Sequence, residues 1–276
     1  MEILYNNFEY LKRPLSIFRR MNLRFLAADK FICCIMNNKK HIKVRLSEPV
    51  GKGVYLHGVY DLGVSEGILR LTNPTDTFGD IGANVGYTSL LASSIVKSEG
   101  QIHAFEPHPE TIKELKRNLE LNNSRVKIHP YGLSEHSGKA SMTVHEEGHR
   151  GAAKIGKGGV QVELRRLDDL GVNFNFIKID VEGHELETLK GLRFTLERVR
   201  DMIFEDDKCS TELHSLLSHL GFTLFKIGRK IDGPSLYELP DNERRVTNWE
   251  PQNYLATRNP ERAIKLFAPR GWRCLH

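Results

Sequence analysis

A glycine-rich turn that follows an acidic residue is the most informative feature of the sequence. Residues 78–89 read FGDIGANVGYTS, in which Asp80 ends a predicted strand and Gly82 and Gly86 frame a turn that opens a helix. The Gly-x-Asn-x-Gly spacing around Asn84 poorly supports a pyrophosphate held on free backbone amides. A carboxylate at this point favours a ligand with an amine or a sulfonium, and S-adenosylmethionine (SAM) carries both.

A second acidic residue, Glu106, lies at the end of the next predicted strand, QIHAFE, and Pro107 then stops that strand. In doubly wound folds an acid at this strand tip, roughly 20 residues past the glycine turn, binds the ribose hydroxyls of the ligand. A predicted helix at 87–97 joins the two strands in one right-handed crossover. The alternative is an ordinary strand, turn and helix with an accidental acid.

A third signal, at residues 174–191, predicts a buried strand at 176–179, then Asp180, then a helix at 185–190. Parallel sheets of this kind bind ligands in a crevice beyond the carboxyl ends of their strands. Asp180 and Glu182 should therefore face the same crevice as the glycine turn. The alternative is that these acids only cap the helix or stabilise its positive N-terminus.

These motifs carry a family resemblance. DIGANVG, FEPHP, GLSEHSG at 132–138, RLDDL at 166–170 and IKIDVEGHELETLKG together resemble the FkbM-type SAM-dependent methyltransferases. The resemblance spans roughly residues 55–260 and implies an α/β, Rossmann-like methyltransferase fold. It predicts a mostly parallel seven-stranded sheet with helices on both faces. Gly79 departs from the pattern, because a larger apolar residue is usual there.

The resemblance also implies where SAM would bind. Its methionine part would lie on the glycine turn, its ribose on Glu106, and its adenine beside Leu133 and Ser134. A Gly63 and Glu66 element before the first strand belongs to the same pattern. The expected cofactor-binding residues are Glu66, Asp80, Gly82, Asn84, Gly86, Tyr87, Thr88, Glu106, Pro107, Leu133, Ser134 and Asp180.

Methyl transfer requires that the methyl donor and the acceptor are aligned and that water is excluded. An alcohol acceptor also needs a group that takes its proton. The candidate catalytic residues are Asp180, Glu182, Glu205, His184 and His149. His184 has a suitable intrinsic pKa, although a histidine that opens a helix is often a capping or solvent-facing residue. In a metal-assisted alternative, Asp180, Glu205 and Asp206 would hold a divalent ion such as Mg²⁺.

The resemblance favours O-methylation of a small molecule, a sugar of a glycan or lipid-linked acceptor, or a natural product. One alternative is an N- or carboxyl-methyltransferase acting on a peptide or RNA. The chain lacks an Asn/Asp-Pro-Pro-aromatic element that would stack a flipped base, which argues against a base-modifying enzyme of that type. Another alternative is a non-catalytic SAM-binding module.

Composition agrees with one enzyme-sized domain. The chain has 276 residues, 39% of them hydrophobic, which is enough for a full α/β core. Residues 1–46 contain ten basic and three acidic side chains, whereas residues 47–241 contain 23 basic and 29 acidic ones. An acidic central region does not favour nucleic-acid binding. Four cysteines without a C-x-x-C pair, and no apolar run long enough to span a bilayer, predict a cytoplasmic location.

Two units are expected. Residues 1–45 should form a basic helical extension, which could be a lid, a dimer arm, a membrane-surface helix or an arm packed on its own core. Residues 46–276 should form the methyltransferase domain. Within it, residues 138–165 predict a β-hairpin insertion whose tip carries His149. Strands are predicted near 78–80, 101–106, 125–130, 176–179, 202–205, 222–227 and 253–257, with a crossing segment at 231–249.

Overall fold

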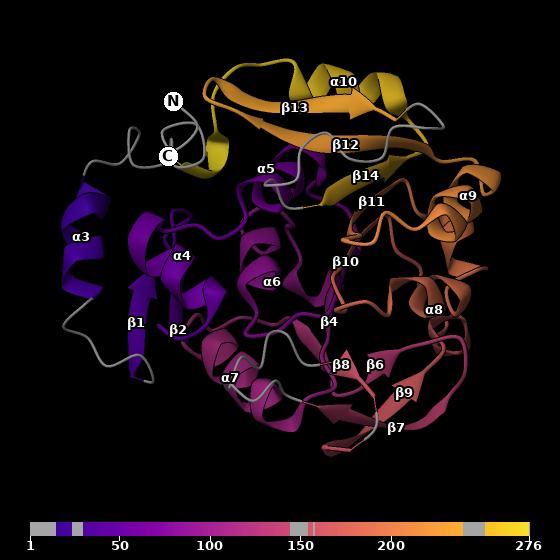
Figure 1. Cartoon of the computed structure of the whole chain (residues 1–276), viewed down its shortest axis with the longest axis horizontal. Coiled ribbons are helices and arrows are strands. Elements are labelled where there is room, and N and C mark those ends of the chain that lie inside the picture. The colour runs from indigo at the N-terminus through magenta and orange to yellow at the C-terminus, as the bar shows by residue number, and fades with distance from the viewer. Residues whose placement is uncertain (1–14, 24–29, 144–153, 157, 240–251, 276) are drawn as a thin grey trace.

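One large sheet forms the centre of the protein (Figure 1). The computed structural model describes residues 15–23, 30–143, 154–156, 158–239 and 252–275. Eight strands lie in the order β13, β12, β14, β11, β10, β3, β4, β5. In chain order they are β3 (Phe78–Ile81), β4 (Ile102–Phe105), β5 (Lys127–His129), β10 (Phe176–Ile179), β11 (Asp201–Glu205), β12 (Thr223–Lys230), β13 (Gly233–Glu238) and β14 (Asn253–Thr257).

The predicted mostly parallel sheet is confirmed. The five neighbouring strands from β11 to β5 are parallel, and β14 runs antiparallel to both β11 and β12. β10 is buried along its whole length, as expected for a strand covered on both faces. The carboxyl ends of β3, β4 and β10 therefore meet at one edge of the sheet, where the predicted acids follow them.

The predicted count of seven strands is wrong, because β13 adds an eighth at the edge. It pairs antiparallel with β12, from Lys230 opposite Gly233 to Phe225 opposite Glu238. The expected crossing segment at 231–249 therefore begins as a hairpin. An Asp-Gly pair at 232–233 is a recognised hairpin signal, so the sequence contained the information.

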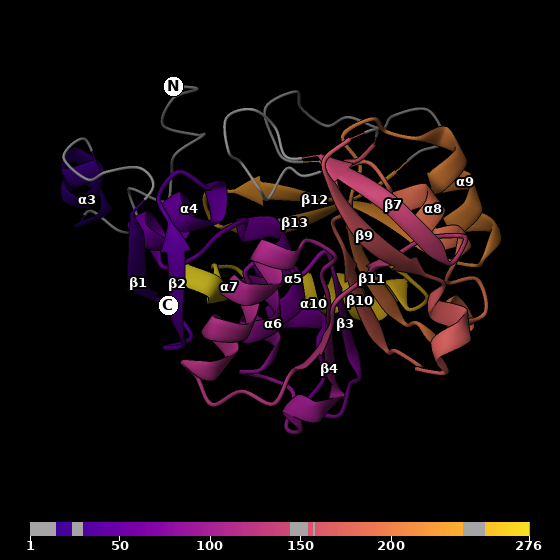
Figure 2. The same cartoon turned by 90° about the horizontal axis from the view of Figure 1, so that it is seen from below.

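Helices cover both faces of the sheet, as predicted, with α5, α6 and α7 on one face and α8 and α9 on the other (Figures 1 and 2). No helix in the described part of the chain is long and apolar enough to cross a membrane. The helices are α3 (Leu15–Leu23), α4 (Pro49–His57), α5 (Leu62–Leu71), α6 (Tyr87–Ala92), α7 (Pro109–Glu120), α8 (Glu185–Lys190), α9 (Thr211–His219) and α10 (Pro260–Phe267), with short 3-10 helices at Glu99–Gln101, Leu167–Leu170, Thr195–Arg198 and Arg273–Leu275.

The N-terminal extension is only partly helical, which corrects the prediction for residues 31–45. α3 is a helix, but β1 (Phe31–Ile35) and β2 (His41–Arg45) form an antiparallel hairpin. Alternation in β2 explains this, since Ile42 and Val44 are buried while the residues between them are not. Both side chains join the core cluster that includes α5 and α6.

The predicted insertion at 138–165 supplies three strands of a separate four-stranded sheet in the order β6, β9, β7, β8, and β6 precedes the insertion in the chain. β7 and β9 are the two antiparallel arms expected from the sequence. His149, at the predicted tip, lies outside the described residues. The strands are β6 (Gly132–Leu133), β7 (Gly138–Thr143), β8 (Lys154–Ile155) and β9 (Val160–Arg165).

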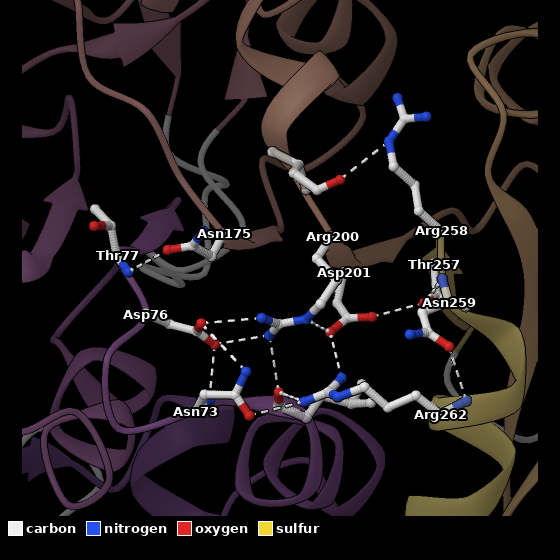
Figure 3. Close-up of polar contacts among 12 residues, drawn as sticks. Asn73, Asp76, Thr77, Asn175, Arg200, Asp201, Thr257, Arg258, Asn259 and Arg262 are labelled. Carbon is white, nitrogen blue, oxygen red and sulfur yellow. Dashed lines mark hydrogen bonds and ion pairs between the residues drawn. The ribbon is translucent and has the colours of Figure 1, made fainter.

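A network of ion pairs holds the opposite, amino-terminal edge of the large sheet together (Figure 3). Arg200 donates to both oxygens of Asp76, at 3.0 and 2.7 Å, and its Nε donates to Asp201 at 2.7 Å. Arg262 reaches the same Asp201 oxygen at 2.9 Å. Thr257 donates to the other oxygen of Asp201 at 2.7 Å. The network links β11, β14, α10 and the segment before β3, so it supports the scaffold.

Candidate functional site

The turn between β3 and α6 has the backbone geometry that its glycines permit. Gly82, Asn84 and Gly86 have positive φ angles of 75°, 49° and 90°. A Cβ on Gly82 would overlap the carbonyl oxygen of Asp180, and one on Gly86 would lie 2.6 Å from Leu115 on α7. The glycines therefore let the turn pass close to β10 and let α6 pack on α7.

The amides of the turn are used inside the protein. The N–H groups of Gly82 and Ala83 both donate to the carbonyl of Phe105, at 3.0 Å, and that of Asn84 donates to Glu106 Oε2 at 3.0 Å. These amides cannot also cradle a phosphate, in agreement with the expectation from the spacing. Only Gly82 and Asn84 are partly exposed within residues 81–90, so they form the accessible surface of the turn.

Asp80 does not present a free carboxylate, which corrects the expectation that it binds the amine of a ligand directly. Its side chain is fully buried, and its Oδ2 accepts hydrogen bonds from Thr88 at 2.7 Å and Ser89 at 2.6 Å. Both donors lie in the first turn of α6. Asp80 thus fixes the start of the helix beneath the turn, and the Thr88 hydroxyl is likewise occupied.

Lys178, which the sequence analysis did not select, links the turn to two acids. Its buried ammonium donates to the carbonyl of Gly82 at 2.8 Å and lies 3.5 Å from Asp80 and 3.4 Å from Asp180. Burial alone would lower the pKa of Lys178, but Asp180 and Asp80 raise it overall. The lysine therefore remains a cation inside the sheet. A charged residue within an otherwise apolar strand pattern was the signal that could have revealed it.

Glu106 lies under the other side of the turn. It is 6% exposed, and its two oxygens accept the N–H groups of Asn84 at 3.0 Å and His108 at 2.9 Å. Burial raises the pKa of Glu106 to about 7, although these two hydrogen bonds oppose the shift. Pro107, next to it, is partly exposed. The acid is therefore preorganised at the tip of β4, beside the accessible surface of the turn.

Two predicted cofactor residues are engaged elsewhere, and the expectation that their side chains contact a cofactor is wrong on this geometry. Glu66 is fully buried, pairs with Arg70 at 2.6 Å, and accepts the N–H groups of Arg273 and Cys274 at 3.0 Å. It anchors the C-terminal segment on α5. The Tyr87 side chain is 4% exposed, and its hydroxyl lies 2.8 Å from that of Ser65 on α5.

The expected adenine-flanking residues lie together with His184. The hydroxyl of Ser134 is 3.0 Å from Nε2 of His184, and the carbonyl of Leu133 accepts a hydrogen bond from Thr188 at 3.0 Å. Burial lowers the pKa of His184. The structure thus joins the start of the insertion to the start of α8. His184 is held in this contact, so it fits a positioning role better than that of a free base.

The other predicted acids gather at the carboxyl ends of β10 and β11. Asp180 has a side chain that is 37% exposed. Glu182 has a positive φ of 55°, and its pKa is raised to about 7 by burial and then by Asp180. Burial, followed by repulsion from Asp180 and Asp61, also raises the pKa of Glu205 well above its ordinary value. This edge of the sheet therefore holds two acids, Glu182 and Glu205, that keep their protons more readily than usual.

Three more residues, not selected from the sequence, border these acids. Asp61 is strained at φ 42° and caps α5 by accepting the N–H of Val64 at 3.1 Å. Asn253, opposite Glu205 in the β11–β14 pair, donates to Asp61 at 2.7 Å. Burial and the surrounding acids raise the pKa of the Tyr60 hydroxyl. Only the folded chain brings this pre-strand segment to the sheet edge, so spacing gave no signal for it.

The described residues contain no group of three or more His, Cys, Asp or Glu side chains that could hold a metal ion. Asp206, one of the proposed ligands, accepts the N–H of Ser210 at 2.6 Å and lies 3.2 Å from His214. It therefore stabilises the start of α9.

The sequence of this site matches a known family. The methyltransferase FkbM domain aligns with residues 80–225, from the first acid of the turn to β12. The chain belongs to this family. One relative, the hexuronic acid methyltransferase AglP of Haloferax volcanii, is 31% identical over 157 residues, which cover 53% of this chain and 64% of AglP. Another, methyltransferase sdnD of Sordaria araneosa, is 33% identical over 189 residues, covering 52% of this chain and 73% of sdnD.

A solved structure is also similar to this chain. The FkbM methyltransferase from Methylobacillus flagellatus has a TM-score of 0.46 and 17% identity, covering 67% of this FkbM-family chain and 44% of that one. The chain thus spans less than two thirds of AglP and less than half of the M. flagellatus protein.

Proposed function

We propose that this FkbM-family methyltransferase transfers a methyl group from SAM to a hydroxyl of a sugar, a glycan or a natural product. One observation carries the proposal. The partly exposed turn at Gly82 and Asn84 lies between Glu106, which follows β4, and Asp180, which follows β10. The two acids thus flank the turn at the carboxyl edge of a parallel sheet, where such folds bind ligands.

The residues fit SAM better than a phosphate ligand. Each oxygen of Glu106 accepts one backbone N–H and keeps a second lone pair, which would accept a ribose hydroxyl. Asn84 and Gly82 offer the accessible turn surface for the rest of the cofactor. Leu133 and Ser134 would border the adenine. The acids around Asp180 suit the positive sulfonium. When bound, SAM supplies an electrophilic methyl group.

The chain's own acids would handle the acceptor. Glu182, with its pKa near 7, is matched to taking a hydroxyl proton at neutral pH. Asp180, held by Lys178 at 3.4 Å, would orient the same hydroxyl. Glu205 keeps its proton more readily and would serve as a hydrogen-bond donor to the acceptor. The name of AglP supports a sugar as the acceptor class.

Two measurements test the proposal. Calorimetry should detect binding of S-adenosylhomocysteine (SAH), and a substitution of Glu106 with Ala should weaken it; absence of binding to the wild type would overturn the use of SAM. Incubation with methyl-labelled SAM and a panel of hexose glycosides should give O-methyl products by mass spectrometry. If label enters only amines or carboxylates, the O-methylation part is wrong.

A further inference from the structure

Helix α3 has its apolar side turned toward solvent. Ile17, Phe18 and Met21 are 50%, 65% and 60% exposed. The opposite side faces the protein, where Ser16 is buried and Arg19 donates to the carbonyl of Tyr55 on α4 at 3.0 Å. A surface helix of a globular protein normally turns its apolar stripe to the core. In this arrangement the described residues leave the apolar stripe of α3 uncovered.

The position of α3 keeps this stripe accessible. The helix lies at the outer edge of the molecule, beside α4 and far from the large sheet, in both views (Figures 1 and 2). At 100° per residue, Ile17, Met21 and Phe18 occupy one arc of about 100° on the helix. The three side chains therefore form one continuous stripe in the middle of α3.

The sequence that contains α3 is strongly basic. Residues 12–30 contain six Lys and Arg residues and one acidic residue, Asp29. Arg20 is exposed, and at 100° per residue it lies next to Ile17 at one edge of the stripe. Exposed apolar side chains bordered by cations are typical of helices that lie in the interface of an anionic bilayer.

Other occupants fit this surface less well. A second copy of the chain that paired α3 with α3 would bring two strongly basic segments together. A nucleic acid would use the cations but not three exposed aliphatic and aromatic side chains. We propose that α3 is a peripheral membrane-docking helix, which inserts Ile17, Phe18 and Met21 between the headgroups of an anionic bilayer. The inference is independent of the methyl acceptor.

Sedimentation with vesicles tests this proposal on the full chain. The wild type should bind vesicles of phosphatidylcholine that contain roughly 30% phosphatidylglycerol and should bind pure phosphatidylcholine far less, because basic segments are attracted to anionic headgroups. The double substitution Phe18→Ser and Met21→Ser should reduce binding about tenfold or more, since it removes the inserted groups. High salt should weaken wild-type binding, because it screens the cations.

A matched control is Phe194→Ser, which removes an equally exposed aromatic side chain (67%) far from α3 in the sequence. It should bind vesicles like the wild type. The circular-dichroism spectrum and the thermal unfolding midpoint should be the same in all variants, which shows that they fold. The proposal would be overturned if the wild type does not bind anionic vesicles, or if the α3 variant binds them as well as the wild type does. A wild-type dimer that the α3 substitutions convert to a monomer would also overturn it.

Discussion

Lys178 and Asp180 lie two residues apart at the end of β10, with Nζ 3.4 Å from Oδ2. The period of two along a strand places both side chains on one side of the sheet. The same ammonium also contacts Asp80 and the carbonyl of Gly82. One buried cation therefore connects the glycine turn, the acid beneath it and the partly exposed acid that follows β10.

Replacing Lys178 with Met should lower the free energy of unfolding by about 3 kcal/mol or more, because Asp80 would remain buried without its cation. Urea denaturation followed by circular dichroism measures this loss. Adding Asp80→Asn to the same variant should restore part of the stability, since the uncompensated charge disappears. A Lys178→Met protein as stable as the wild type would contradict this role of the lysine.

Substituting Asp180 with Asn should leave SAM affinity within several-fold of the wild type but reduce turnover about a hundred- to ten-thousand-fold. The reason is that Asp180 would orient the acceptor hydroxyl, and without this orientation the proton would not be transferred to Glu182. Single-turnover methyl transfer and calorimetry separate the two effects. Asp169→Asn, which changes an exposed aspartate, is the matched control and should keep full activity. Near wild-type turnover in Asp180→Asn would mean that Asp180 has no catalytic role.

The affinity for SAH should fall as the pH drops below about 7, the pKa to which burial raises Glu106. The ionised carboxylate accepts the ribose hydroxyls, so the ligand must compete with a proton below that pH. One pH unit below the pKa, the dissociation constant should rise about tenfold. Calorimetry from pH 5.5 to pH 8 checks this, and Glu106→Gln should show little dependence on pH in the same range. A flat wild-type profile would exclude the ionised Glu106 as the ribose acceptor.

The sequence predicted a strand or helix well where an apolar run marks the element and a glycine marks its end. The strand at 176–179 and the helix at 185–190 have the bounds that the pattern gave. The hairpin at 31–45 was missed, because its short alternating segments follow an imperfect helical stripe. In this segment the pairing of β1 with β2 and the packing of their side chains on the core favour strands over a helix.

The site was harder to predict, because several contacts depend on distant parts of the chain. Asp80 was expected to end the first strand, but β3 extends to Ile81 and buries it, and its contacts depend on hydroxyls of α6. Asp61 reaches the crevice through Asn253, which lies 192 residues later. Such contacts follow from sheet order, and no local spacing encodes them.

Glu205 should make the stability of the cofactor-free protein depend on pH. Burial and repulsion from Asp180 raise its folded-state pKa well above 4.5, its ordinary value. Its contribution to stability is therefore complete below about pH 4.5 and is lost as the pH rises through the higher folded-state value. Glu205→Gln removes this penalty, so the variant should gain stability relative to the wild type as the pH increases from 5 to 8.5. Urea denaturation at several pH values measures the difference, and Glu197→Gln, at an exposed glutamate, should show no such trend. If the difference between Glu205→Gln and the wild type stays constant over this range, Glu205 titrates normally and cannot be the proton-holding acid of the crevice.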